Sequence, residues 1–202
     1  MRNLTQVAVL AGRLASEDFG NIMSGRAYYS LALDSAREAG DGQLAAIAHG
    51  YAAQLAAAEG LTIAALDHLT AATENACCTP AVTSWLAATE AAIHADRGDH
   101  QLARDALDRA RAELDKPAQR LTPVWLDEHP ADYLAAATGY TLLRAGDHHG
   151  ARDALAMALD TLHATAHRQR ALLLIDLATA ELHTSNLPDA CVHATQAANL
   201  LH

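Results

Sequence analysis

The chain of 202 residues has few of the features that mark membrane, secreted or all-β proteins. Aromatic residues make up only 4% of it, and there are five prolines. No long stretch alternates apolar and polar residues with β-branched types, which argues against a sheet. It contains no run of 18 or more apolar residues and no signal peptide, so we expect a cytoplasmic protein that makes no membrane contact.

Cysteine is equally scarce, and its positions do not suggest a disulfide framework. The three cysteines are Cys77, Cys78 and Cys191, an odd number with two of them adjacent. The interpretation we favour is free thiols in a reducing compartment. A redox or soft-metal role for Cys77 and Cys78 is the alternative, but no neighbouring His or Cys spacing completes a site. We therefore expect no metal and no cofactor.

Positive charge is also in short supply. Fourteen Lys and Arg face 24 Asp and Glu, for a net charge of −10. A nucleic-acid binder would need a basic stripe to neutralise phosphates, so we expect no direct nucleic-acid binding by this chain. What the chain has in abundance is alanine, the best helix former and a small side chain in a core. This composition predicts an all-α protein with closely packed helices.

A repeat runs through the whole chain. Turn-like residues recur at positions 20, 60, 98, 146 and 185, with spacings of 40, 38, 48 and 39 residues. Five positions after each turn residue stands a small residue: Gly25, Ala65, Ala103, Ala151 and Ala190. Nine positions after it stands a usually larger one: Tyr29, Leu69, Leu107, Leu155 and Ala194. Twelve positions after it stands alanine: Ala32, Ala72, Ala110, Ala158 and Ala197.

The offsets of four and three residues place these side chains on one face of a helix. A small residue after a tight turn lets the second helix approach the first, and the larger residue fills the space beside the crossing. We expect a single domain, 1–202, made of helical hairpins that stack because none buries its apolar face alone. The predicted hairpins span about 3–38, 42–76, 80–115, 131–164 and 167–201. A loop insert at 116–130 carries Pro117, Pro123 and Pro130, which disfavour helix.

The small–large–small pattern resembles the tetratricopeptide repeat (TPR), most clearly in residues 98–110 and 146–159. The resemblance implies an all-α, right-handed superhelical solenoid of about five TPR-like hairpins. Two features differ from the family. The units are longer than the usual 34 residues, and the first helices mostly lack the Trp, Leu-Gly and Tyr signature.

A narrower resemblance is to the C-terminal sensor domain of actinobacterial lambda-repressor-like helix-turn-helix transcriptional regulators. The segments that carry it are 27–33, 36–41, 85–88 and 170–178. The resemblance implies a regulatory domain that senses a peptide, a protein partner or a small ligand and that forms a homodimer. The DNA-binding domain of that family has no counterpart here, so we expect either an excised sensor domain or a stand-alone relative.

In a TPR solenoid the first helix of each hairpin lines the concave face. By helical phase we place Trp85, Tyr133, Tyr140, Gln54 and Arg144 in this groove as ligand- or partner-binding residues, since aromatic rings with a polar handle suit a peptide or a small apolar ligand. The alternative is that the aromatic side chains pack between hairpins.

Two other functions stay open. The chain could serve only as an oligomerisation scaffold, or it could be an enzyme of a biosynthetic pathway with Asp127, Glu128 and His129 in acid–base roles. We favour a simpler interpretation of those three residues as the entry to a helix that starts near Ala131, because acidic groups suit a helix N-terminus. No catalytic motif occurs, so we expect a non-catalytic binding module.

Overall fold

The computed structural model describes residues 1–74, 78–117, 130–163 and 166–201. Within these ranges the protein is helical and has no strand, which confirms the predicted all-α class. The α-helices are α1 (Arg2–Arg13), α2 (Ile22–Ala39), α3 (Gly42–Ala58), α4 (Thr62–Glu74), α5 (Pro80–Asp96), α6 (His100–Leu114), α8 (Pro130–Arg144), α9 (His148–Thr161), α10 (His167–His183) and α11 (Leu187–Leu200). A π-helical segment, η1 (Leu14–Asp18), continues α1.

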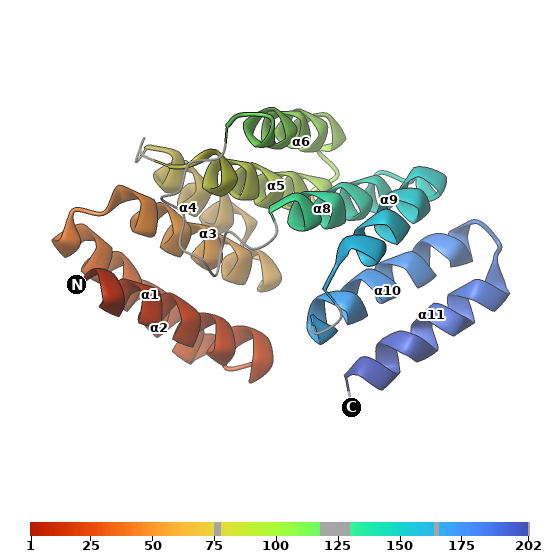
Figure 1. Ribbon diagram of the computed structural model, residues 1–202, viewed down its shortest axis with the longest axis horizontal. Helices are drawn as coiled ribbons and strands as arrows, with labels where there is room; N and C mark the ends of the chain where they lie inside the picture. Colours follow the sequence, from red (N-terminus) through yellow and green to blue (C-terminus); the bar gives the residue numbers. More distant parts are fainter. Residues whose placement is uncertain (75–77, 118–129, 164–165, 202) are drawn as a thin grey trace.

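Consecutive helices pack in pairs, and the pairs follow one another along an arch (Figure 1). The pairs are α1 with α2, α3 with α4, α5 with α6, α8 with α9, and α10 with α11. Helix α6 lies on the outer side of the arch, while α5 and α10 face its inside. Segment η1 and the start of α10 meet across the opening, so the first and last helix pairs become neighbours.

The turn inside each pair has a residue in the left-handed region. These residues are Gly20 (φ 61°), Gly60 (φ 75°), Gly98 (φ 79°), Gly146 (φ 83°) and Ser185 (φ 61°). Glycine adopts this conformation without a Cβ clash, which explains its recurrence at four of the five turns. In two of the units the residue after the glycine caps the second helix: Asn21 Oδ1 accepts the Ser24 N–H at 3.0 Å and Asp147 Oδ1 accepts the Gly150 N–H at 2.9 Å.

The residues of the small–large–small pattern form the contact between paired helices. Every one of the fifteen positions is buried except Ala194, which lies on the last helix and has no further pair to cover it. The larger residues press against the first helix of their own pair. A Cβ on Gly139 would lie 2.5 Å from Leu155 Cγ, and one on Gly12 would lie 2.5 Å from Tyr29 Cε1. Glycine at these two points sets how close the helices come.

The structure describes only part of the predicted loop insert. Helix α6 ends at Leu114 and α8 begins at Pro130, so most of the predicted loop insert 116–130 lies outside the described residues. Among the helices described, none combines the length and apolar character that a membrane crossing requires.

Substitutions at two equivalent turn positions, 98 and 185, should change the free energy of unfolding in opposite directions. Ser185→Gly should raise the free energy of unfolding by about 0.5–1 kcal/mol, because it relieves the left-handed strain of a residue with a Cβ. Gly98→Ala should lower that free energy by about 1–2 kcal/mol for the converse reason, since open space around Gly98 leaves only the backbone cost. Urea unfolding followed by circular dichroism measures both. Equal effects of the same sign would contradict the assignment of these turns.

Candidate functional site

A row of aromatic rings crosses the middle of the arch. Tyr29 of α2 stacks on Tyr51 of α3 with ring centroids 6.2 Å apart, and Tyr51 contacts Trp85 of α5 at 4.8 Å. Trp85 meets Tyr133 of α8 edge-on at 6.4 Å. The Trp85 ring lies against Gly50 of α3, where any Cβ would collide with it. These four rings, the aromatic row, connect the first four helix pairs.

The hydroxyl of Tyr133 is held by a small hydrogen-bond network. Gln54 Nε2 donates to the Tyr133 oxygen at 2.9 Å and to Thr89 Oγ1 at 3.3 Å. The Thr89 hydroxyl donates to the Trp85 carbonyl at 3.0 Å, so the Tyr133 hydroxyl donates to Thr89 Oγ1 across 3.1 Å. Burial raises the pKa of Tyr133, and the bonds from Thr89 and Gln54 partly oppose this rise. Tyr133 therefore stays a neutral phenol with both its donor and its acceptor used.

Three of the five predicted binding residues thus come together, but most of their surface is used in packing. Trp85 is only 6% exposed, and its ring contacts Tyr51 and Tyr133 from two sides. Gln54 spends its amide donors on Thr89 and Tyr133. In this part of the molecule the aromatic side chains join neighbouring helix pairs.

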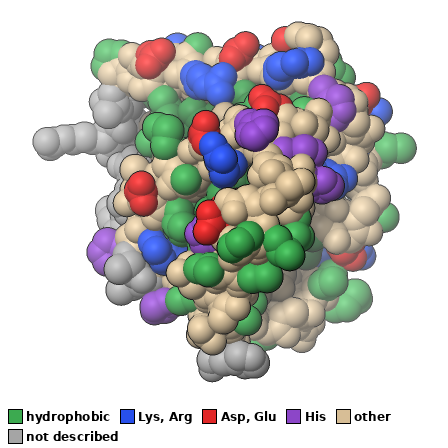
Figure 2. All heavy atoms as spheres, turned by 90° about the vertical axis from the view of Figure 1, so that its right-hand side faces the viewer, with side chains coloured by type: hydrophobic (Ala, Val, Ile, Leu, Met, Phe, Trp, Pro, Cys, Tyr) green, Lys and Arg blue, Asp and Glu red, His purple; other side chains and the backbone are tan. Residues whose placement is uncertain are grey.

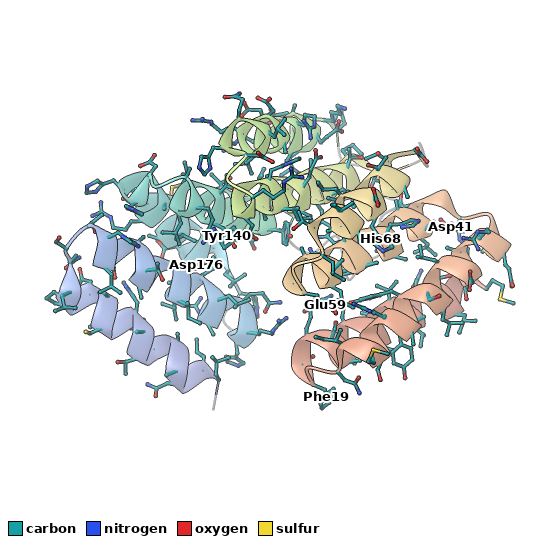
Figure 3. All side chains as sticks on the ribbon, turned by 180° about the vertical axis from the view of Figure 1, so that it is seen from behind. Phe19, Asp41, Glu59, His68, Tyr140 and Asp176 are labelled. Atoms are coloured by element: carbon teal, nitrogen blue, oxygen red, sulfur yellow. The ribbon has the colours of Figure 1, made fainter. Side chains whose placement is uncertain are left out.

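The other two predicted residues belong to a separate cluster that is open to solvent. Tyr140 donates to Asp96 Oδ1 at 2.5 Å, and Arg144 Nε pairs with the same oxygen at 3.1 Å. Asp176 of α10 lies beside Tyr140 (Figure 3). Burial, and then the charge of Asp96, raises the pKa of Asp176 to about 6. Burial and Asp96 also raise the pKa of Tyr140. We call Asp96, Tyr140, Arg144 and Asp176 the acidic cluster.

A third cluster closes the opening of the arch. Arg168 Nη1, in the first turn of α10, pairs with Glu17 Oε2 of η1 at 2.5 Å, although 151 residues separate them. Glu17 Oε1 also lies 3.9 Å from Arg13 Nε, and the Arg13 guanidinium stands over the Tyr51 ring at 5.1 Å. We call Arg13, Glu17 and Arg168 the opening cluster. It adjoins the aromatic row through the contact of Arg13 with Tyr51.

The outer side of the arch offers a different kind of site. A hollow of about 300 Å³ lies between α4, α5 and α6, lined by Leu69, Thr73, Thr83, Leu86, Ala87, Glu90, Arg109, Ala112 and Glu113. The Arg109–Glu90 ion pair at 2.7 Å contributes to its wall. Its volume is at the lower end of the range for small-molecule pockets.

The candidate residues for metal ligation and acid–base chemistry are placed only in part by the structure. No three His, Cys, Asp or Glu side chains there approach closely enough to hold a metal ion. Histidines gather on the face formed by the last two helix pairs (Figure 2), where the His148 and His183 rings stack at 4.2 Å. Cys191 is exposed and Cys78 half-buried. The proposed acid–base residues Asp127, Glu128 and His129, together with Cys77, lie outside the described residues.

Comparison with known proteins gives no relative from which to transfer a function. No family model matches the chain, and no curated protein matches it in sequence.

Sequence reasoning found the aromatic residues and missed their charged neighbours. Asp96, Asp176 and Glu17 stand on different helices, so no local spacing connects them with Tyr140 or Arg168. Each basic residue of this region has a different partner: Arg144 pairs with Asp96, Arg168 with Glu17, and Arg170 with the carbonyls of Leu159 and Leu162. The exception is Glu17, whose i, i+4 spacing from Arg13 was a readable signal.

Removing one oxygen tests the Tyr133 network. Tyr133→Phe should lower the free energy of unfolding by about 1–2 kcal/mol, because Gln54 and Thr89 each lose a buried partner. Tyr28→Phe, on an exposed part of α2, is the matched control and should change it by less than about 0.5 kcal/mol. Chemical denaturation of the two variants measures the difference. Equal effects at both positions would show that the network does not stabilise the fold.

Asp176 predicts a pH dependence of stability. Its folded-state pKa of about 6 exceeds the ordinary 3.8, so the protonated form favours folding at acidic pH and this contribution is lost as pH rises through 6. Asp176→Asn should therefore raise the free energy of unfolding by about 1 kcal/mol at pH 7.5, since partial exposure weakens the effect. At pH 4 the variant and wild type should be nearly equal. The exposed Asp153→Asn serves as control, and a pH-independent difference would contradict the shift.

Proposed function

We propose that the chain is a non-catalytic binding module of the tetratricopeptide type that holds a ligand on the inside of its arch. The observation that carries the proposal is that two partly exposed clusters of charged side chains join helices from four different pairs. The opening cluster comes from the first and last pairs, and the acidic cluster from the third, fourth and last. Such convergence of polar groups beside apolar surface is typical of ligand sites.

Stability alone is a poor explanation for these clusters. Exposed ion pairs contribute little to folding, and the raised pKa of Asp176 means that its carboxylate opposes folding at neutral pH. Groups that cost stability and face a shared space are candidates for function. A ligand that contacts several pairs at once would also change the curvature of the arch, because each helix pair touches mainly its neighbours.

In this proposal the module is a regulatory sensor in the cytoplasm, and its ligand is a peptide, a protein partner or a small molecule with an apolar body. The arch form and the paired helices with glycine turns support a TPR-type solenoid. Tyr140 and Arg144 are the predicted residues best exposed to a ligand, whereas Trp85, Tyr133 and Gln54 act as the support behind it.

A second candidate is a scaffold that forms homodimers, and one observation favours it. The first helix pair exposes large apolar side chains, with Phe19 80%, Met23 74% and Val7 61% exposed. Light scattering on the purified chain decides this alternative. A single species at the mass of 21.3 kDa across concentrations would exclude it.

Retention of small molecules and peptides tests the binding function directly. Wild-type protein dialysed against fractionated cell extract should retain a compound that mass spectrometry detects after denaturation, and the same fraction should raise Tm. The inner-face double variant Tyr140→Phe/Arg144→Gln should retain at least about tenfold less, since it removes a hydrogen-bond donor and a charge.

The matched control is Arg109→Gln, which alters the hollow on the outer side of the arch. It should retain the compound as wild type does. No enriched compound together with an unchanged Tm, or equal retention by the inner-face variant, would refute the proposal.

A further inference from the structure

The opening cluster carries an imbalance of charge. In the part of the chain that the structure describes, the other arginine–carboxylate pairs give each arginine its own acid, whereas Glu17 serves both Arg13 and Arg168. The cluster therefore has a net charge of +1 in a chain whose net charge is −10. An unmatched positive charge on the inside of an acidic protein attracts one further anionic group.

Of the two arginines, Arg13 is the one that Glu17 does not reach within hydrogen-bonding distance. Its Nε–H is shielded from solvent and has no hydrogen-bond acceptor, because the nearest carboxylate oxygen is 3.9 Å away. A buried donor without a hydrogen-bond acceptor costs free energy, and a bound group that supplies an acceptor removes this cost. The guanidinium is nevertheless held in place above the Tyr51 ring. Arg13 is therefore a fixed guanidinium at the edge of the aromatic row, with one donor that has no acceptor.

Arg168 lies at a position where a positive charge does not stabilise its own helix. It lies in the first turn of α10, at the positive end of the helix dipole, and no acidic residue or side-chain cap balances it there. Cations normally favour the opposite end of a helix. The position makes sense if Arg168 faces an anion, first the Glu17 carboxylate and then a ligand that takes its place.

The local backbone brings Glu17 to this point. Residues Leu14–Asp18 form a π-helical turn, and the Ser16 hydroxyl donates to the Gly12 carbonyl at 2.8 Å within it. A π-turn inserts one residue and rotates the following side chains, and such turns concentrate at functional sites. Leu14 at its start is 52% exposed, and Leu172, one turn beyond Arg168, is 50% exposed. Apolar surface therefore flanks the charges on both sides of the opening.

We infer that the opening cluster is a binding site for a monocarboxylate on an apolar body, and that Glu17 is the resident group which this carboxylate displaces from Arg13 and Arg168. The inference rests on the proposed binding function and specifies its ligand chemistry. The planar fork of each guanidinium matches a carboxylate. The displaced Glu17 carboxylate remains attached to the same turn beside the two arginines, so one further negative charge brings the local charge to zero. A dianion would add excess charge to an acidic protein. Displacement of Glu17 also releases the ion pair between the first and last helix pairs.

The test uses 2-naphthoate and its neutral counterpart 2-naphthamide with the full chain. Binding is followed through the side-chain Nε–H resonances of Arg13 and Arg168 in a ¹⁵N-labelled sample. Wild type should bind the acid at least about tenfold more tightly than the amide, as expected for a charge-assisted bidentate contact. Acetyl-phenylalanine and its carboxamide distinguish a peptide C-terminus from a free organic acid as the source of the carboxylate.

Glu17→Gln gives the most specific result, because removal of the competing carboxylate should tighten naphthoate binding several-fold. Asp108→Asn is the matched control: it removes the same charge from an ion pair within α6, on the outer side, and should leave the affinity unchanged. Arg168→Gln should weaken binding of the acid at least about tenfold and leave that of the amide unaltered. Circular dichroism verifies that each variant folds.

The outcomes separate the two levels of the proposal. Equal affinity of acid and amide in wild type, or weaker naphthoate binding in Glu17→Gln, overturns the carboxylate site and leaves the binding function intact. Failure of all four probes to bind also overturns the site, while the dialysis experiment then decides the binding function independently. The wild-type comparison of acid and amide needs no variant, so a substitution that disturbs folding does not remove the test.

Discussion

The two helices of each pair approach closely because glycine or alanine stands where they cross, and the rest of the structure depends on this approach. Gly12 accepts the Tyr29 ring and Gly139 accepts Leu155, with no room for a Cβ at either point. Close crossing buries the larger residue of the first four units, so a core made mostly of alanine still reaches dense packing. It also brings the first helices near enough for a row of aromatic rings to join one pair to the next.

The polar side chains inside the arch fall into two sets, one buried between helix pairs and one partly exposed to solvent. Gln54, Thr89 and Tyr133 satisfy one another inside the contact between helix pairs, where an unpaired group would be costly. Asp96, Asp176, Arg13 and Arg168 belong to partly exposed clusters, and not every polar atom in them has a partner of its own. Asp176 has a raised pKa, and Arg13 keeps a donor without an acceptor. The first set holds the arch together, and the second makes its inner side suitable for recognition.

The arch brings together residues of the first and last helix pairs, which contact between consecutive helices alone would leave far apart. Arg168 and Glu17 meet only because the curvature of all the intervening pairs adds up to bring α10 back to η1 (Figure 1). A contact of this kind reports on the shape of the whole chain. Any change in the angle between two adjacent pairs would change the distance between η1 and α10. This couples the opening cluster to the packing of the other helix pairs.

The sequence by itself determined the helical class, the turns and the buried face of each second helix, because these depend on local rules. Left-handed turns favour glycine, and offsets of four and three residues place Ala65, Leu69 and Ala72 on one side of a helix whatever lies around it. Helical phase also placed Trp85, Tyr133 and Tyr140 in the groove as binding residues, with packing between hairpins as the alternative. Only the tertiary structure decided that Trp85 and Tyr133 are packed while Tyr140 meets Asp96, and that Glu17 lies between two arginines. Those contacts depend on the angles between successive helix pairs, and angles that accumulate over a long chain leave no trace in local spacing.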